Sequence, residues 1–250
     1  MHRFFLPPDS FTKSSINLPA DTARQISRVL RLDIGDEIIV LDNKRYEYLC
    51  EIETLNKDSA TAKIISQTKN LNEPRVNITM ALSLTQRDKF EWMLQKCTEL
   101  GAAAFIPVQT SRTLIQDMQK IHNKLPRWRK IVQEAAEQSA RGLVPDIHDP
   151  ITLQNLITTI DKKNTLPMIP WEDEEDKSIK DIFEQEKNAL FENILILIGP
   201  EGGFSIEEVQ KAENGGFRSI TLGRRILRME TAAVAALAQT LFIYENWQDG

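Results

Sequence analysis

Three arginines stand in an unusual place in the stretch "LGRRILRMETAAVAAL", which covers residues 222–237. Arg224, Arg225 and Arg228 lie between a predicted strand and an apolar helix that we expect to begin near Met229. Cations at a helix N-terminus oppose the helix dipole, at a cost of about 0.3–1 kcal/mol each. A sequence that breaks such a local rule often does so at a functional site. The three guanidinium groups are therefore candidates for binding or catalysis.

A purely structural role for these arginines is the alternative. Glu230 follows them in the sequence, and the acidic stretch "WEDEEDKS" covers residues 171–178. Ion pairs with either partner would satisfy the arginines without any ligand. The acidic stretch itself is typical of a solvated loop, because runs of like charge usually face water.

A second candidate is the stretch "ILILIGPEGGFS", residues 194–205. A continuous apolar run that ends in turn residues predicts a strand buried on both faces. In open α/β sheets, ligands bind beyond the carboxyl ends of such strands. The turn matches neither the G-x-G-x-x-G dinucleotide motif nor a phosphate loop ending in Gly-Lys-Ser/Thr.

The two turns "LIGPEGG" and "LGRRILR" are expected to open toward the same side of a parallel sheet. They offer backbone amides and the apolar side chains of Leu222, Ile226 and Leu227, without a lysine or hydroxyl for phosphate and magnesium. A ligand that fits such walls is an adenosine with an uncharged or cationic tail.

Composition narrows the class of protein. Of the 250 residues, 41% are hydrophobic and 27% are charged, as in ordinary globular proteins. We find no apolar run of about 18 residues and no signal-peptide pattern, so we expect a cytoplasmic protein without a membrane span. Cys50 and Cys97 are expected to be reduced and buried, and the scattered histidines predict no metal site. The net charge of −5 argues against a generally basic, nucleic-acid-binding surface. Nucleic-acid binding nevertheless depends on local patches of charge and not on the sum.

The elements that must position the two turns divide the chain into two predicted domains. Residues 1–72 contain short strands, typical of a small β-barrel, with one helical insertion for which Asp21 is a possible N-cap. Residues 73–250 alternate strands and helices, which predicts an α/β domain with a parallel sheet. The strands are expected at residues 76–84, 102–110, 165–171, 193–199 and 217–223, and the helices at residues 86–100, 125–141, 177–187, 206–214 and 229–247.

Local signals mark several ends of these helices. Ser205 and Glu208 form a predicted capping box, and Gly101 is a predicted helix stop. Glu137, Gln138 and Arg141 lie near one face at the end of another helix, where they are either functional or part of an ordinary surface terminus. The last helix is apolar nearly all round, so it is expected to be buried in the core or in a subunit interface.

Four stretches, "IGPEGGFSIEE", "LGRRILRMETAAVAAL", "QKCTELGAAAFIPVQTSRT" and "EAAEQSAR", together resemble the RsmE family. These are SPOUT methyltransferases that modify N3 of a uridine, at position 1498, in 16S ribosomal RNA. "MHRFFL" and "RVLRLDIGDEIIVLD" resemble the PUA-like RNA-binding domain of the same family. The resemblance covers nearly the whole chain, and its "LGxRILRxETA" pattern is more specific than "GPEGG".

The resemblance implies a SPOUT-type parallel sheet with a C-terminal trefoil knot, behind a PUA-like β-barrel, in an obligate homodimer. It implies S-adenosylmethionine as cofactor and 16S ribosomal RNA within the assembled small subunit as substrate. Carried over to this sequence, the cofactor-binding residues are Leu166, Pro167, Ile198, Gly199, Pro200, Gly202, Gly203, Leu222, Gly223, Ile226 and Leu227. The expected RNA contacts are Arg3, Arg28, Arg31, Arg112, Gln138, Arg141 and Arg224.

The implied reaction assigns roles to two further residues. N3 of uracil must lose its proton to become a nucleophile, and an arginine near O2 or O4 would stabilise the resulting anion. Arg228 is the candidate for this role, and Glu201 is the candidate for orienting the uracil or acting as a base.

Two alternatives stay open. A SPOUT ribose 2′-O-methyltransferase would share the fold and the cofactor, but such relatives usually carry "NEG" and "SLNVS" where this chain has "GPEGG" and "RMETAAV". A non-catalytic ribosome-assembly protein would keep a vestigial pocket, against which the intact set of cofactor-loop residues argues. Two departures from the family pattern, Gln25 and the charged turn at residues 43–45, bear on RNA contact rather than on methyl transfer.

Overall fold

The computed structural model describes residues 1–113, 117–186 and 191–248. The chain forms two compact units. The first consists of Met1–Glu73 with Ala136–Val144, and the second of Pro74–Ala135 with Pro145–Gly250. The sequence did not indicate that the nine-residue stretch Ala136–Val144 would join the first unit.

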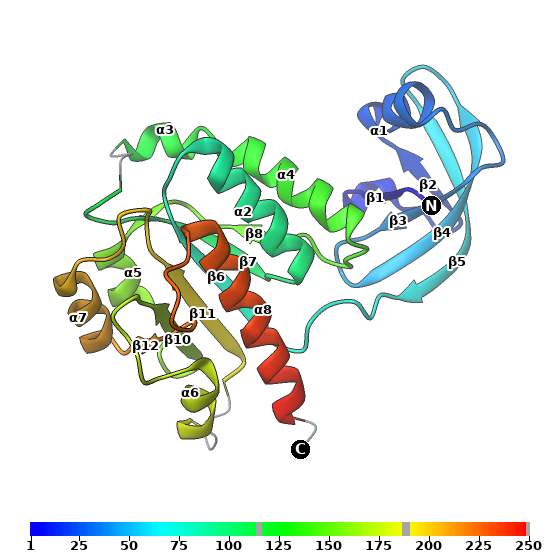
Figure 1. Ribbon diagram of the computed structural model, residues 1–250. Helices are drawn as coiled ribbons and strands as arrows, with labels where there is room; N and C mark the ends of the chain where they lie inside the picture. Colours follow the sequence, from blue (N-terminus) through cyan, green and yellow to red (C-terminus); the bar gives the residue numbers. More distant parts are fainter. Residues whose placement is uncertain (114–116, 187–190, 249–250) are drawn as a thin grey trace. The chain divides into compact units, whose positions relative to one another are not determined.

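The first unit is a curled five-stranded sheet around its own core (Figure 1). The strand order is β1-β3-β4-β5-β2, in which β1 runs parallel to β3 and the other pairs are antiparallel. Ile16, Ile38 and Ile52 are fully buried at its centre. The small β-rich first domain is confirmed, although the sequence signals had not located β1 and β2. The strands are β1 (Arg3–Phe5), β2 (Ser15–Leu18), β3 (Glu37–Leu41), β4 (Tyr46–Leu55) and β5 (Ala60–Lys69).

The helical insertion of the first unit differs from its prediction. A short 3-10 helix, Pro8–Ser10, comes first along the chain. Helix α1 (Ala20–Arg24) begins after Pro19 and passes directly into a π-helical stretch, Gln25–Leu30. Asp21 lies inside the first turn and pairs with Arg24, so its prediction as N-cap is wrong. The proline supplies the fixed φ that starts the helix without a side-chain cap.

The second unit is built on a seven-stranded, entirely parallel sheet. Its order is β12-β10-β11-β6-β7-β8, with β9 pairing with β7. The α/β prediction is confirmed, and the five predicted strands are present with ends that differ by a few residues. The strands are β6 (Asn77–Ser83), β7 (Ala104–Gln109), β8 (Asp146–Ile147), β9 (Ile151–Thr152), β10 (Thr165–Pro170), β11 (Asn193–Ile198) and β12 (Arg218–Ile220).

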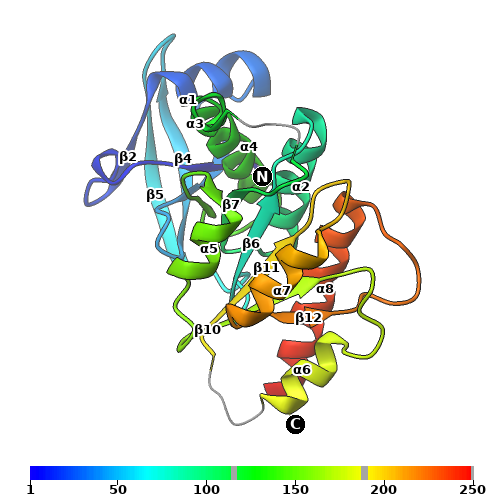
Figure 2. The same cartoon turned by 90° about the vertical axis from the view of Figure 1, so that its left-hand side faces the viewer.

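Helices cover both faces of this sheet (Figures 1 and 2). Leu195 and Leu197 of β11 share a core with α5 and α7, and the alternation of the strand turns Ile194 and Ile196 to the opposite face. There α8 packs along α2 and contacts β11 and β6. The helices are α2 (Arg87–Leu100), α3 (Met118–His122), α4 (Leu125–Gln138), α5 (Leu153–Thr159), α6 (Ile179–Gln185), α7 (Ile206–Asn214) and α8 (Met229–Gln248).

The predicted helix signals hold at two places. Ser205 caps α7 in a complete capping box with Glu208, and Gly101 ends α2 with a φ of 111°. The predicted helix over residues 177–187 appears as α6, and residue 187 lies outside the described part of the chain.

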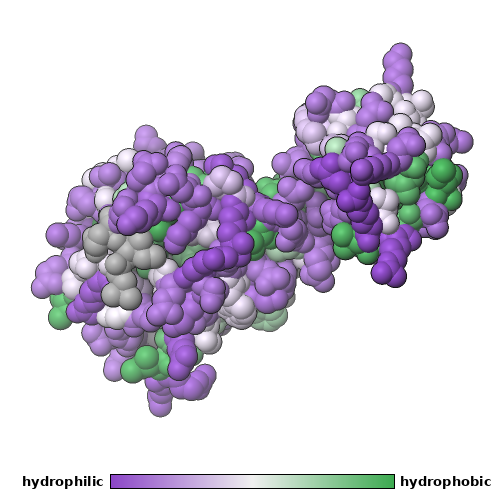
Figure 3. All heavy atoms as spheres, turned by 90° about the horizontal axis from the view of Figure 1, so that it is seen from above, coloured by the Kyte–Doolittle hydropathy of each residue, from purple (hydrophilic) through white to green (hydrophobic). Residues whose placement is uncertain are grey.

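The two cysteines and the surface of the molecule bear on its class. Cys50 and Cys97 are free and buried, and burial raises the pKa of each thiol to about 12. The face seen in Figure 3 is largely hydrophilic, with apolar side chains in separate patches. Among the described residues, we find neither a helix able to span a membrane nor a cluster of His, Cys, Asp and Glu suited to a metal ion.

Candidate active site

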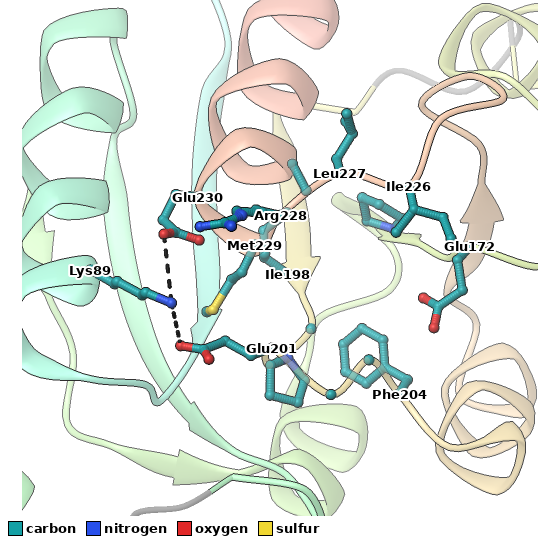
Figure 4. A pocket seen from close by; sticks show the side chains of 16 residues that line it. Lys89, Glu172, Ile198, Glu201, Phe204, Ile226, Leu227, Arg228, Met229 and Glu230 are labelled. Atoms are coloured by element: carbon teal, nitrogen blue, oxygen red, sulfur yellow. Dashed lines mark hydrogen bonds and ion pairs between the residues drawn. The ribbon is translucent and has the colours of Figure 1, made fainter.

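The two turns singled out in the sequence meet at one edge of the parallel sheet. The glycine turn, residues 199–203, follows β11, and the arginine turn, residues 221–228, connects β12 to α8. Together they enclose a cavity of about 640 Å³ (Figure 4), a size typical of ligand pockets. Its walls are Lys89, Pro170, Glu172, Ile198, Gly199, Pro200, Glu201, Gly202, Gly203, Phe204, Ile226, Leu227, Arg228, Met229, Glu230 and Ala232.

A second cavity of about 590 Å³ adjoins the first and shares Ile226 and Leu227 with it. The remainder of the arginine turn forms one side, and the acidic loop, residues 171–178, forms the other. The carboxyl ends of β10, β11 and β12 therefore converge on the two cavities, as expected for a ligand site in a parallel sheet.

Glycine is required at three positions around these cavities. A Cβ at Gly199 would lie 2.8 Å from the Phe204 ring, and Gly203 has a φ of +66°, which L side chains rarely adopt. Gly223 has a φ of +105°, but a Cβ there would meet no atom within 4 Å. Gly223 therefore leaves open space at the second cavity, into which a ligand can approach the backbone closely.

Glu201 is held in place by two donors from the neighbouring elements. The hydroxyl of Thr85 donates to Oε1 of Glu201 over 2.8 Å, and Nζ of Lys89 donates to the same oxygen over 2.9 Å. The bond from Lys89, then that from Thr85, and the nearby charges lower the pKa of the Glu201 carboxyl. A carboxylate that is stabilised in its ionised form is a weak general base, so Glu201 suits orientation better than proton abstraction.

Thr85 and Lys89 are functional candidates that sequence reasoning missed. Lys89 lies in the first turn of α2, and Thr85 lies between β6 and α2. The available signal was the sheet itself, because β6 is the neighbour of β11 and its carboxyl end must reach the same edge. A polar residue directly after that strand was therefore a candidate.

The arginine turn is open to solvent. Arg224, Arg225 and Arg228 are exposed, and within the described part of the chain none of their side chains forms an ion pair or a hydrogen bond. Pairing with Glu230 or with the acidic loop, the structural alternative, is therefore not observed. Arg228 still acts on Glu201 through space, since its charge contributes to the lowered pKa of that carboxyl.

The acidic loop is more structured than its sequence indicated. The carboxylate of Glu174 accepts the hydroxyl of Ser219 over 2.7 Å and the backbone amides of Asp176 and Lys177. Burial opposes ionisation of Glu174, but these bonds and the nearby Lys177 charge outweigh it, so its pKa is lowered. The loop is thus fastened to β12, and its Glu172 lies at both cavities.

Most of the cofactor-binding residues expected from the resemblance come together here. Leu166 and Pro167 are the exceptions, because both are buried inside β10 and line neither cavity. Pro170 and Glu172, at and beyond the end of the same strand, take their place in the walls. The expected residues that line one or both cavities are Ile198, Gly199, Pro200, Gly202, Gly203, Leu222, Gly223, Ile226 and Leu227.

Within the second unit, the residues expected to contact RNA differ in their surroundings. Arg224 lines the second cavity and is exposed. Arg112 instead donates through one nitrogen to the carbonyl of Gly202 over 2.6 Å and to that of Phe204 over 3.4 Å. Arg112 therefore braces the glycine turn.

Within the first unit, Arg28, Arg31 and Gln138 are exposed, whereas Arg3 is bound to Glu47 over 2.8 Å. Arg141 does not suit an RNA contact, because its side chain is only 4% exposed and its guanidinium forms a two-pronged ion pair with Glu73, at 2.6 and 3.3 Å.

Comparison with known proteins agrees with the geometry. Residues 72–241 match the model of an RNA methyltransferase domain, and residues 19–65 match that of an RNA methyltransferase PUA domain. Proteins named ribosomal RNA small subunit methyltransferase E are similar to the chain. The Bacillus subtilis protein is 33% identical over 95% of both chains. The Synechocystis protein is 33% identical over 98% of this chain and 78% of its own. The chain belongs to this methyltransferase E family.

Solved structures extend the comparison with the family. The methyltransferase E of Neisseria gonorrhoeae, solved with S-adenosylmethionine, is 31% identical and superposes with a TM-score of 0.87 over 97% of this chain and 98% of its own. A methyltransferase of Legionella pneumophila, also solved with this cofactor, gives a TM-score of 0.80 at 26% identity over 95% of this chain and 96% of its own. The predicted family, the PUA-like first domain and the assignment as a methyltransferase are confirmed.

Proposed function

We propose that this chain methylates N3 of a uridine in the RNA of the small ribosomal subunit, with S-adenosylmethionine as methyl donor. Membership of the methyltransferase E family supports the RNA substrate and the cofactor. One observation carries the base-directed reaction. The guanidinium of Arg228 is exposed beside the cavity and has no partner among the described residues.

The walls of the two cavities fit this cofactor. Ile226 and Leu227 offer apolar surface between the cavities, and the glycine turn offers backbone at close approach. At Gly223 a Cβ would fill space that is open in the structure. These uncharged parts of the walls suit an adenosine, and Glu172, which lies at both cavities, suits the cationic part of the molecule.

The proposed mechanism divides the work between cofactor and protein. Bound S-adenosylmethionine supplies an already activated methyl group. The protein then has to align N3 of the uracil with that group and to favour the deprotonated ring. Arg228 stabilises the negative charge that N3 deprotonation places on O2 or O4, and no acid group competes with it by direct pairing among the described residues. Glu201, kept ionised by Lys89 and Thr85, orients rather than abstracts, so the proton leaves to solvent.

Product mapping tests this reaction. Small subunits from cells that lack the modification are incubated with the protein and methyl-labelled S-adenosylmethionine, and the labelled nucleoside is identified by mass spectrometry. We expect N3-methyluridine at one position. A 2′-O-methylated nucleoside would assign the reaction to the ribose, and binding of cofactor without any product would support an assembly protein instead.

We further propose that the chain acts as a homodimer. Ile226, at the lip of both cavities, is 91% exposed, and Phe242 of α8 is 69% exposed. Large apolar side chains in such positions favour a partner surface. Sedimentation at micromolar concentration is expected to give a dimer, and a monomer would contradict the proposal.

The substrate is proposed to be the assembled small subunit rather than naked RNA. The net charge of −5 leaves little affinity from counterion release, so shape and local contacts must supply the binding. We expect faster methylation of the assembled subunit than of protein-free RNA. We also propose residues 1–72 as the RNA-binding domain, residues 73–250 as the methyltransferase domain with the C-terminal knot, and the cytoplasm as the location.

A further inference from the structure

We propose that Lys89 is a positioning residue that holds the carboxylates of Glu201 and Glu230 away from Arg228, so that the arginine keeps its charge for the substrate. The inference rests on the proposed role of Arg228. It starts from the arrangement of charges in the first cavity, where two cations and two carboxylates line one wall (Figure 4).

The four charged groups come from three elements. Lys89 belongs to α2, Glu201 to the glycine turn, and Arg228 and Glu230 to the junction of the arginine turn with α8. Nζ of Lys89 lies 2.9 Å from Oε1 of Glu201 and 4.0 Å from Oε1 of Glu230. A single ammonium group is thus hydrogen-bonded to one carboxylate of the wall and lies at ion-pair distance from the other.

The alternative partner of both carboxylates is Arg228. It is two residues from Glu230 in the chain, and its charge already lowers the pKa of Glu201. An ion pair of Arg228 with either carboxylate would place a compensating negative charge beside the guanidinium. The stabilisation of a uracil anion would fall, because the charge that it needs would be neutralised in advance.

Solvent exposure is consistent with a confined position of Lys89. The side chain of Lys89 is 30% exposed and that of Glu230 is 20% exposed, so both are shielded from much of the water. Glu201, at 40%, is also held by the Thr85 hydroxyl, which donates to the same oxygen as Lys89. Lysine and threonine together therefore hold this carboxylate on the α2 side of the cavity.

A mutant cycle of Lys89 with both carboxylates, Glu201 and Glu230, distinguishes positioning from direct contact. We expect Lys89→Met to lower the kcat of methyl transfer about tenfold or more, with the affinity for S-adenosylmethionine within about threefold of wild type. Lys89→Arg, which keeps the charge, is expected to retain most of the activity. In a background that carries both Glu201→Gln and Glu230→Gln, Lys89→Met is expected to cost less than about threefold further, because both carboxylates that it restrains are gone.

The same cycle contains the outcomes that would overturn the proposal. A full tenfold loss from Lys89→Met on top of Glu201→Gln and Glu230→Gln would mean that Lys89 touches the substrate itself. Loss of cofactor affinity or of thermal stability together with activity would mean a structural role. Product mapping on the wild-type protein comes first, so that absence of N3-methyluridine is counted against the proposed function alone.

Carboxyl titration by NMR tests the inference without turnover. The pKa of Glu201 is expected to rise in Lys89→Met, because its strongest partner is lost. The substitution Arg228→Met is then made in the wild type and in the Lys89→Met protein. We expect it to raise the pKa of Glu201 more in the Lys89→Met protein, because without the lysine Glu201 has turned to Arg228. Equal steps in both backgrounds would show that Lys89 does not keep the two groups apart.

Discussion

Two loops of this molecule carry arginines that the sequence marks as functional, and the structure treats them in opposite ways. In the loop after α4, the guanidinium of Arg141 is buried against Glu73, whose carboxylate also accepts the amides of Gly142 and Leu143. In the arginine turn, three guanidinium groups face solvent without a partner among the described residues. A buried cation must be paired, whereas an exposed and unpaired one is available for a ligand. The partner therefore distinguishes a structural arginine from a catalytic candidate.

The largest effect is expected where the pair is buried. Arg141→Ala leaves the Glu73 carboxylate, itself 4% exposed, without its cation. The free energy of unfolding of the first unit is expected to fall by about 3–5 kcal/mol, the scale for breaking a buried pair. Urea unfolding followed by a probe in the first unit measures it. The matched control is Arg28→Ala, which removes an exposed arginine of the same unit and is expected within about 0.5 kcal/mol of wild type. A similar loss in both variants would remove the contrast between the two loops.

Arg228→Ala is expected to show the opposite phenotype. Methyl transfer should fall about 10²-fold or more, the scale for losing one preorganised electrostatic group, while stability is unchanged. Affinity for S-adenosylmethionine should stay within a few-fold, as measured by isothermal titration. Raising the pH should partly restore the rate, because more of the uracil is already deprotonated. If cofactor affinity and thermal stability drop together and pH has no effect, Arg228 only braces its turn.

The sequence predicted features that depend on local signals, but not contacts between residues far apart in the chain. Strands such as β11 and helices such as α7 were predictable because their signals are local: an apolar run, a capping box, a glycine stop. The walls of the cavity were predictable from two turns at the ends of parallel strands. The ion pair of Arg141 and the contact of Lys89 with Glu201 were not, because each joins residues far apart in the chain, 68 and 112 positions respectively.

The same limit explains the misplaced details. Asp21 has the right chemistry for an N-cap, but Pro19 sets the start of α1 two residues earlier. Leu166 and Pro167 lie in the right strand, yet their side chains are in the sheet core, since only residues at or beyond the strand end reach the cavity. Local type and spacing identify the element, and the three-dimensional register decides which residue of it faces the ligand.

Arg112 is the intermediate case between the two loops, because it is exposed and yet bound to the carbonyls of Gly202, in the glycine turn, and of Phe204, directly after it. Arg112→Ala removes two charge-assisted hydrogen bonds at the surface, worth about 1 kcal/mol together after solvent competition. We expect affinity for S-adenosylmethionine to fall about fivefold, with the KM for RNA and its salt dependence unchanged. Isothermal titration and kinetics at two salt concentrations measure both. A raised KM with unchanged cofactor affinity would restore Arg112 to the RNA contacts expected from the resemblance.

The smallest effect is expected at Arg224 in the arginine turn, where it tests whether a single exposed guanidinium contacts the RNA. Its side chain has no partner among the described residues, so Arg224→Ala should leave the melting temperature unchanged. If the guanidinium meets one phosphate of the RNA, affinity should fall by only a few-fold, and the slope of log affinity against log salt should become shallower by about 1. Binding of small subunits at several salt concentrations measures this slope, and Arg129→Ala, which lines neither cavity, should leave it as in wild type. An unchanged slope with lowered affinity would mean that Arg224 acts on the cofactor through the second cavity, because loss of a phosphate contact must release fewer counterions.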